Sequence, residues 1–181
     1  MNAVNWVDTV IRFWFEELGP KDWFSARIEV DEIIRERFAD LHAALHREPP
    51  DMKALSPTGH VAAVIVFDQF SRNLFRGSAK TYATDSLALA LATHAVDHSL
   101  DSSLDAHQRH FLYMPFMHSE DRATQARSVQ LFRALSDPDV LRYAEHHAGI
   151  VDRFGRFPRR NEILGRASSE DERNFLKADT R

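Results

Sequence analysis

Residues 65–77 read IVFDQFSRNLFRG and form the second half of a strongly apolar segment. The segment opens with Ser56-Pro57, a typical N-cap followed by proline at the first helical position, and Gly77 suits the position just after a helix end. These signals predict a helix over residues 57–76. Its first two turns are apolar nearly all round, which indicates a helix buried on every side.

Four polar side chains interrupt the apolar surface of this predicted helix. Asp68 and Arg72 are four residues apart, as are Gln69 and Asn73, so one face changes from aliphatic residues to two polar pairs. Two interpretations stay open. The four residues either brace the core through mutual contacts, because unpaired buried charges are costly, or they line a groove that receives a ligand.

Helical periodicity dominates the rest of the chain, and strand-like alternation is nearly absent. About eight helices packed as antiparallel pairs are expected, in one all-α domain that covers residues 1–181. Pro115 should end or kink one helix, and Ser119 is a plausible cap for the next. No fixed-period repeat is visible. The predicted helices cover residues 3–18, 29–47, 57–76, 79–98, 104–114, 119–136 and 137–155, and the last one opens with SSEDERNFL at 168–176.

The composition narrows the class of protein. With 181 residues and 44% apolar residues, the chain can bury a core of its own. A net charge of −4 gives no global field that would favour nucleic acid or anionic lipid. The absence of cysteine suits a reducing cytoplasm. Because the first residues lack a basic n-region and no apolar run is long enough to span a bilayer, we expect a cytoplasmic protein without membrane association.

A second polar cluster is RHFLYMPFMHSED, residues 109–121. Its end delivers His118, Ser119, Glu120 and Asp121 to a predicted helix N-terminus, where backbone N–H groups point outward. Such a place suits an anion or a general base. The alternative is plain N-capping, with His118 as a packed linker residue.

A third cluster is HHAGIVDRFGRFPRRNEILGR, residues 146–166. Residues 152–166 contain five arginines and only two acidic residues, Asp152 and Glu162, in a protein that is acidic overall. Guanidinium groups favour two-point contacts with carboxylate or phosphate. In the helix before this loop, His147 falls on the apolar face and should point inward, whereas His146 should face solvent. A packed core histidine is the alternative to a functional role for His147.

The chain resembles a mainly bacterial family catalogued as domain of unknown function 924. The matching segments are FWFEELGPKDWF, DQFSRNLFRG, FLYMPFMHSED, RFGRFPRRNEILGR and SSEDERNFL, in the same order and over nearly the whole chain. The resemblance implies a tetratricopeptide-like all-helical fold and no particular activity. The family pattern usually has proline where Ser71 stands and histidine where Arg159 stands. A mechanism that needed a titrating histidine at Arg159 would be absent here.

Binding is the first functional hypothesis: a small anionic ligand, or an acidic peptide or protein partner, held in a polar groove. We expect no nucleic acid, metal or cofactor. The predicted ligand-binding residues are Gln69, Arg72, Asn73, Arg153, Arg156, Arg160 and Asn161. The alternative is a hydrolase or transferase in which His118 or His147 acts as base and Asp68 or Glu120 as orienting acid. No HExxH, GxSxG or P-loop signature supports that alternative.

Overall fold

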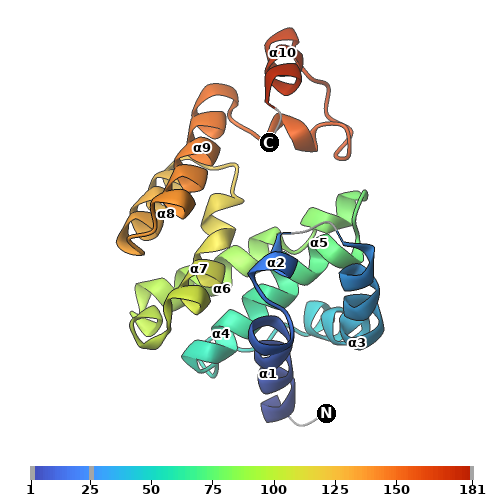
Figure 1. Cartoon of the computed structure of the whole chain (residues 1–181), viewed down its shortest axis with the longest axis vertical. Helices are drawn as coiled ribbons and strands as arrows, with labels where there is room; N and C mark the ends of the chain where they lie inside the picture. The colour runs from blue at the N-terminus through green and yellow to red at the C-terminus, as the bar shows by residue number, and fades with distance from the viewer. Residues whose placement is uncertain (1–2, 25–26, 180–181) are drawn as a thin grey trace. The chain divides into compact units, whose positions relative to one another are not determined.

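The computed structural model describes residues 3–24 and 27–179, and within these ranges it contains helices and no strand. The all-α prediction is therefore confirmed, and eight of the α-helices have at least seven residues. The chain divides into two compact units (Figure 1). The N-terminal unit comprises residues 1–76 and 80–115, and the C-terminal unit comprises residues 77–79 and 116–181. None of the described helices is long and apolar enough to cross a membrane.

The N-terminal unit is built around the central helix of residues 57–74. The chain is helical throughout residues 57–74, as α4 (Pro57–Val64), the π-helix η2 (Ile65–Phe70) and α5 (Ser71–Leu74). Every residue from Gly59 to Ser71 is buried, as its apolar surface predicts. The helix ends at Leu74, two residues before the predicted end, with Phe75 as its C-cap. Gly77 adopts a left-handed φ of 78°, which favours glycine, in the turn that follows.

The other helices of this unit pack around that centre. α4 contacts α1 and α6, while α5 and the π-helix contact α3. Phe70 of the π-helix joins the aromatic core, with its ring 4.7 Å from Phe38 and 5.7 Å from Trp14, centroid to centroid. The remaining elements are α1 (Ala3–Arg12), the π-helix η1 (Phe13–Glu17), α2 (Pro20–Trp23), α3 (Ile28–Arg47), the 3₁₀ turns η3 (Ala79–Tyr82) and η4 (Leu100–Ser103), α6 (Asp85–Asp97) and α7 (Ala106–Met117).

The C-terminal unit contains a helix pair followed by a compact loop. α8 (Arg122–Ala134) packs on α9 (Pro138–Phe154), and the 3₁₀ turn η5 (Pro158–Arg160) contacts α10 (Glu170–Ala178). Gly155 ends α9 in the left-handed region with a φ of 70°, as a C-terminal glycine should. Ser169 caps α10 in a reciprocal capping box with Glu172.

Other predicted boundaries were also wrong. The helix predicted over residues 79–98 begins only at Asp85 as α6, after the 3₁₀ turn η3. α7 runs through Pro115 to Met117, because the proline lies in the last turn, where its missing N–H removes a single bond of the helix. Ser119 is not the cap of α8. Asp121 takes that position, and its carboxylate accepts the N–H of Thr124 at 2.8 Å. This shift leaves Glu120 outside the helix and available for other contacts.

Candidate functional site

The polar face of the central helix is held together by one guanidinium between two carboxylates. Arg72 Nη1 lies 3.1 Å from Asp68 Oδ1 and 3.2 Å from Asp85 Oδ1, and it also donates to the backbone carbonyl of Asp68. The carboxylate of Asp68 is fully buried. Burial acts to lower the pKa of Arg72, but the two carboxylates raise it above its ordinary value. The predicted pair of Asp68 and Arg72 is therefore present and charged.

Gln69 and Asn73 do not form the second predicted pair. Gln69 donates to Asp68 Oδ2 at 2.5 Å and to the sulfur of Met114 at 3.4 Å. Asn73 instead donates to Asp31 Oδ1 at 2.7 Å, next to two donors from Arg76. Each amide therefore bonds to a carboxylate, Gln69 to Asp68 and Asn73 to Asp31, and not to the other amide.

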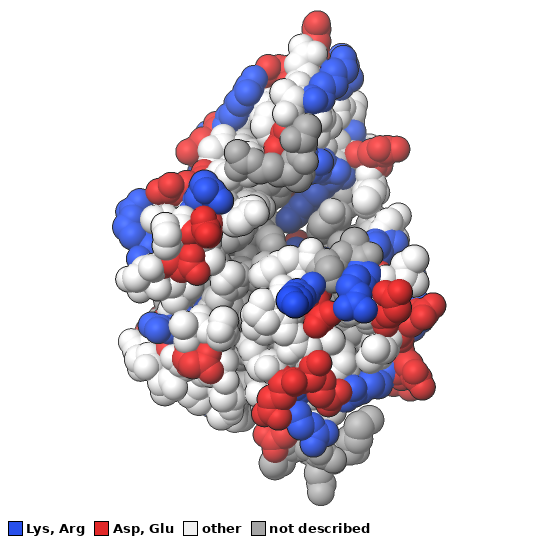
Figure 2. Space-filling view, viewed as in Figure 1, with Lys and Arg blue, Asp and Glu red and all other residues white. Residues whose placement is uncertain are grey.

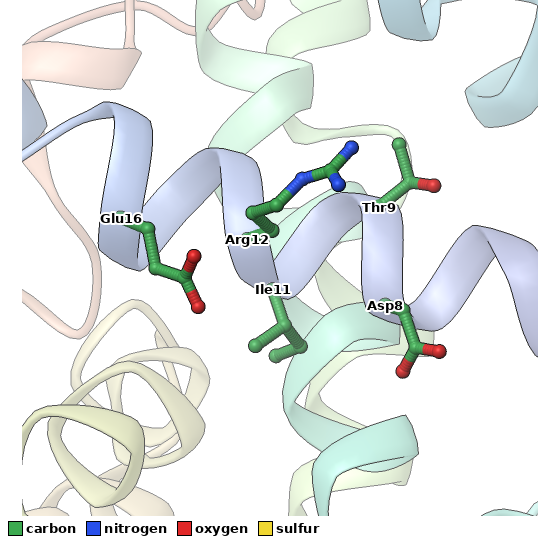
Figure 3. A pocket seen from close by; sticks show the side chains of 5 residues that line it. All are labelled: Asp8, Thr9, Ile11, Arg12 and Glu16. Atoms are coloured by element: carbon green, nitrogen blue, oxygen red, sulfur yellow. The ribbon is translucent and has the colours of Figure 1, made fainter.

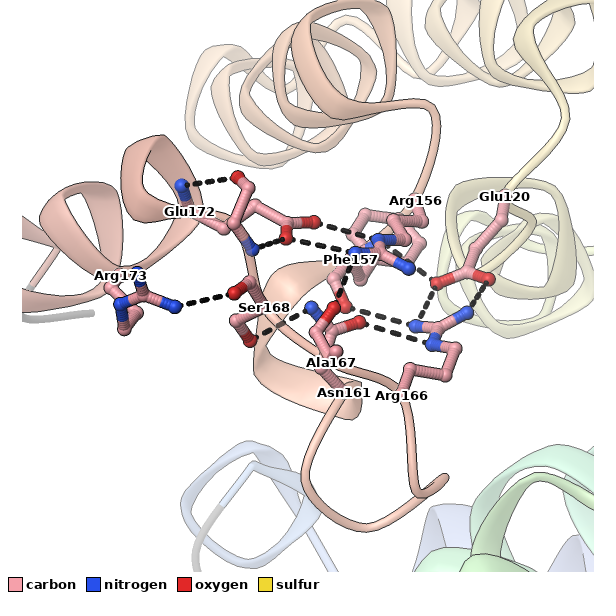
Figure 4. Close-up of polar contacts among 10 residues, drawn as sticks. Glu120, Arg156, Phe157, Asn161, Arg166, Ala167, Ser168, Glu172 and Arg173 are labelled. Carbon is pink, nitrogen blue, oxygen red and sulfur yellow. Dashed lines mark hydrogen bonds and ion pairs between the residues drawn. The ribbon is translucent and has the colours of Figure 1, made fainter.

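In the C-terminal unit, Glu120 and Arg166 form a two-point ion pair with N–O distances of 2.6 and 2.9 Å (Figure 4). Glu120 Oε1 also accepts the backbone N–H of Phe157 at 2.7 Å. Burial alone would raise the pKa of Glu120, yet these bonds to Arg166 and Phe157 hold it below its ordinary value. Glu120 therefore fastens the loop after α9 as an ionised group.

A second two-point pair joins Arg156 to Glu172 of α10. Arg156 Nε lies 2.6 Å from Oε1 and Nη2 lies 2.8 Å from Oε2, and Nη2 also donates to the carbonyl of Ala167 (Figure 4). Glu172 is 3% exposed. The bond from Arg156 is the main cause that lowers the pKa of Glu172 to about 2.

Asn161 links these two pairs. Its side-chain oxygen accepts Arg166 Nε at 3.0 Å, and its amide donates to Ser168 Oγ at 3.1 Å. At 1% exposed, Asn161 is part of the interior of the loop. Arg153 lies outside this interior and pairs with Asp171 at 2.6 Å, with both side chains more than half exposed.

Four basic side chains of the C-terminal unit form a group that we name the cationic cluster: His146, His147, Arg159 and Arg160. The guanidinium of Arg160 lies 4.7 Å from the ring centroid of Phe157, and the ring of His147 lies 5.5 Å from the same centroid, edge on. Arg160 also donates to the backbone carbonyl of His118 at 2.8 Å. The side chain of His118 is half-buried.

His147 is fixed in one orientation. Its Nδ1 lies 2.8 Å from the carbonyl of Tyr143 and acts as the donor, which leaves Nε2 as an acceptor in the neutral ring. Burial is the main cause that lowers the pKa of His147, and the nearby charge of Arg160 lowers it further. The inward orientation predicted for His147 holds in part, because its ring packs on Phe157 while remaining partly accessible. His146 is also partly buried, not solvent-facing as predicted.

One acidic residue of the C-terminal unit contacts the cationic cluster directly. Asp179 Oδ2 lies 3.2 Å from Arg159 Nη2 and 3.9 Å from His146 Nε2, and Arg159 also donates to the backbone carbonyl of Asp179. The charge of Asp179 acts to raise the pKa of His147. The carboxylate is 8% exposed, whereas the guanidinium of Arg159 is half exposed.

Two cavities lie in the N-terminal unit, away from the predicted site residues. One of about 300 Å³ follows α1, where the side chains of Asp8, Ile11 and Glu16 point to one side and Arg12 to the other (Figure 3). The second, of about 470 Å³, lies between α1 and the start of α4 and includes Trp6 and Asp51 in its lining. Within residues 3–24 and 27–179, no group of three or more His, Asp or Glu side chains is arranged to hold a metal ion.

Comparison with known proteins places the chain in a family. The model of the bacterial proteins of unknown function called DUF924 matches residues 10–180. The chain belongs to the DUF924 family. A solved structure of a protein of unknown function from Agrobacterium tumefaciens is similar to this DUF924 protein, with 38% sequence identity and a TM-score of 0.90 over 96% of this chain and 97% of that chain. No curated protein matches. The tetratricopeptide-like relation stays a prediction.

The sequence predicted the loop arginines of the DUF924 protein but missed most of their partners. Glu172 and Arg166 lie in recognised segments, and the spacing of Ser169 and Glu172 is that of a capping box, which was a usable signal. Asp85 and Asp31 carried no signal, because each is an ordinary acidic residue in the first turn of a helix. Asp179 carried no signal either, because it is a single acidic residue after the end of α10.

Proposed function

We propose that this DUF924 protein binds a small anionic ligand or an acidic peptide or protein partner, and that the cationic cluster of the C-terminal unit receives the anion. The observation that carries the proposal is the placement of Arg160 and His147 on one ring, that of Phe157. The charge of Arg160 acts to lower the pKa of His147, so an anion bound beside both side chains would favour the protonated ring and gain contacts to two cations.

The remaining predicted arginines are less suited to a ligand. Arg72 and Arg156 already make contacts to carboxylates that are almost fully buried. A ligand would have to displace a buried carboxylate that further donors also hold, Gln69 on Asp68 and the Ser169 N–H on Glu172, and breaking such a pair is strongly unfavourable. Figure 2 shows acidic and basic side chains interspersed on the face drawn there, in keeping with this internal pairing. These residues therefore support the fold around the proposed site more than the ligand itself.

Calorimetric titration of the whole chain with succinate and with inorganic phosphate tests the proposal directly. Arg160→Gln should weaken binding at least about tenfold, since a charge-assisted hydrogen bond contributes roughly 1.5–3 kcal/mol. Arg133→Gln is the matched control, because it removes an exposed arginine of the same unit whose partner is Glu145. The control should bind as the unmodified protein does. Binding of neither anion, or equal binding by Arg160→Gln, contradicts the proposal.

One observation favours the hydrolase or transferase alternative. The lowered pKa of His147 keeps its ring neutral at pH 7, and the bond to Tyr143 leaves Nε2 as a proton acceptor, as a general base requires. Glu120 is less suited to the role of orienting acid in this alternative, because its carboxylate already accepts three hydrogen bonds. Any hydrolysis of ester or phosphate-ester probes by the purified protein should disappear in His147→Asn. Activity that survives this substitution excludes His147 as the base.

A further inference from the structure

We infer that the natural ligand of the cationic cluster carries a carboxylate, and that Asp179 occupies the place of this carboxylate until the ligand displaces it. The inference rests on the proposed function. Its starting point is the side chain of Asp179, which meets Arg159 at 3.2 Å and His146 at 3.9 Å. A carboxylate in this position is what an acidic peptide or small organic acid would supply.

Arg159 contacts Asp179 as it would contact a ligand. One guanidinium nitrogen meets both the side-chain oxygen and the backbone carbonyl of Asp179. The carboxylate is 8% exposed, while the guanidinium remains half exposed. Solvent therefore reaches the guanidinium while Asp179 is bound, so an incoming anion can approach Arg159 before Asp179 leaves.

The rest of α10 is attached independently of Asp179. Arg156 holds Glu172, Arg153 holds Asp171, and the ring of Phe154 lies 5.1 Å from that of Phe175, centroid to centroid. Asp179 itself follows the end of the helix and is the C-cap, with its N–H bonded to the carbonyl of Phe175. Helix ends open at low free-energy cost, so Asp179 can leave the cluster while α10 stays docked.

The energetic consequence is competition within one chain. A group tethered next to its site acts at an effective concentration in the millimolar range, so even a weak contact lowers the apparent affinity of an external carboxylate. Removal of the Asp179 charge should therefore tighten binding of a carboxylate ligand. A group that merely braces the fold would give the opposite result, because its loss would loosen the cluster.

The decisive experiment compares the unmodified chain with Asp179→Asn by calorimetric titration with succinate. We expect Asp179→Asn to bind succinate several-fold to about tenfold tighter, as expected for removal of a tethered competitor. Asp171→Asn is the control, since it removes an acidic residue of the same helix that pairs with the exposed Arg153. It should leave the affinity unchanged.

Each other outcome has a definite meaning. Equal or weaker binding of succinate by Asp179→Asn overturns the occupancy of the site by Asp179 and leaves the proposed function standing. Tighter binding of inorganic phosphate than of succinate by both proteins overturns the carboxylate class. Binding of neither probe by either protein overturns the proposed function, and with it this inference. A melting curve of Asp179→Asn should show that the variant remains folded, because the contacts of Glu172 and Phe175 are retained.

Discussion

Arg156 and Glu172 join the end of α9 to the first turn of α10 through two parallel contacts of 2.6 and 2.8 Å. The pair also completes the cap of α10, because Glu172 Oε2 accepts the backbone N–H of Ser169 at 2.7 Å. A single carboxylate thus fixes the loop arginine and the start of the last helix. This relationship explains why the arginine-rich loop can be ordered without a ligand.

Arg156→Gln should destabilise the C-terminal unit. The substitution leaves the nearly inaccessible carboxylate of Glu172 without its guanidinium, so the free energy of unfolding should fall by clearly more than it does in Arg153→Gln. Urea denaturation gives the free energy of unfolding. Arg153→Gln should change it by less than about 0.5 kcal/mol, because its pair with Asp171 is exposed. Equal effects of the two substitutions would refute the structural role of Arg156.

Acid should weaken the same contact. The pKa of Glu172 is lowered to about 2 from an ordinary 4.5, so the folded state favours the ionised group. This stabilisation is complete above pH 4.5 and is lost as the pH falls toward 2. Glu172→Gln should flatten the dependence of unfolding free energy on pH in this window. An unchanged slope in Glu172→Gln would show that other carboxylates dominate.

In the N-terminal unit, Asp68 should matter more than Asp85. Both carboxylates contact Arg72, but Asp68 is fully buried whereas Asp85 is 20% exposed. Asp68→Asn is therefore expected to cost about 3 kcal/mol, the lower end of the range for a broken buried pair. Asp85→Asn should cost roughly half as much, since water can replace part of its contact. Chemical denaturation of both variants checks the order, and the reverse order contradicts it.

His42 should stay neutral far below the usual range of histidine. Its Nε2 lies 2.7 Å from Ser71 Oγ, and Ser71 in turn meets the hydroxyl of Thr84 at 2.7 Å. Burial is the main cause that lowers the pKa of His42 to about 4. Proton NMR of the ring during a pH titration measures this value directly. A midpoint near 6.5 would mean that water reaches the ring and that the hydroxyl chain is open.

Local patterns in the sequence predicted most of the fold, because helix caps and apolar periodicity are properties of short segments. Asp137 at the start of α9 and Gly155 at its end are examples, and both act as the pattern indicates. The errors arose where one segment depends on another. Asn73, for example, bonds to Asp31 of α3, which lies 42 residues away in the chain and which helical spacing around residue 73 cannot reveal.

The candidate site was predicted by residue type more than by partnership. Within residues 152–166 the arginines outnumber the acidic residues, because the carboxylates that pair with them lie outside this segment. These carboxylates are Glu120, Asp171, Glu172 and Asp179. Side-chain pairing over such separations depends on the fold and not on local spacing. The predicted ligand-binding roles of Gln69, Arg72, Asn73, Arg153, Arg156, Arg160 and Asn161 remain predictions.

The most direct test of anion binding at the cationic cluster is the pKa of His147 in Asp179→Asn, measured by NMR with and without saturating succinate. In the unmodified chain, succinate would replace a carboxylate that already acts to raise this pKa. Because an adjacent anion favours the protonated ring, succinate should raise the pKa of His147, and its affinity should increase as the pH falls. In Arg160→Gln, the rise caused by succinate should be much reduced. A pKa of His147 that is the same with and without succinate would contradict the account.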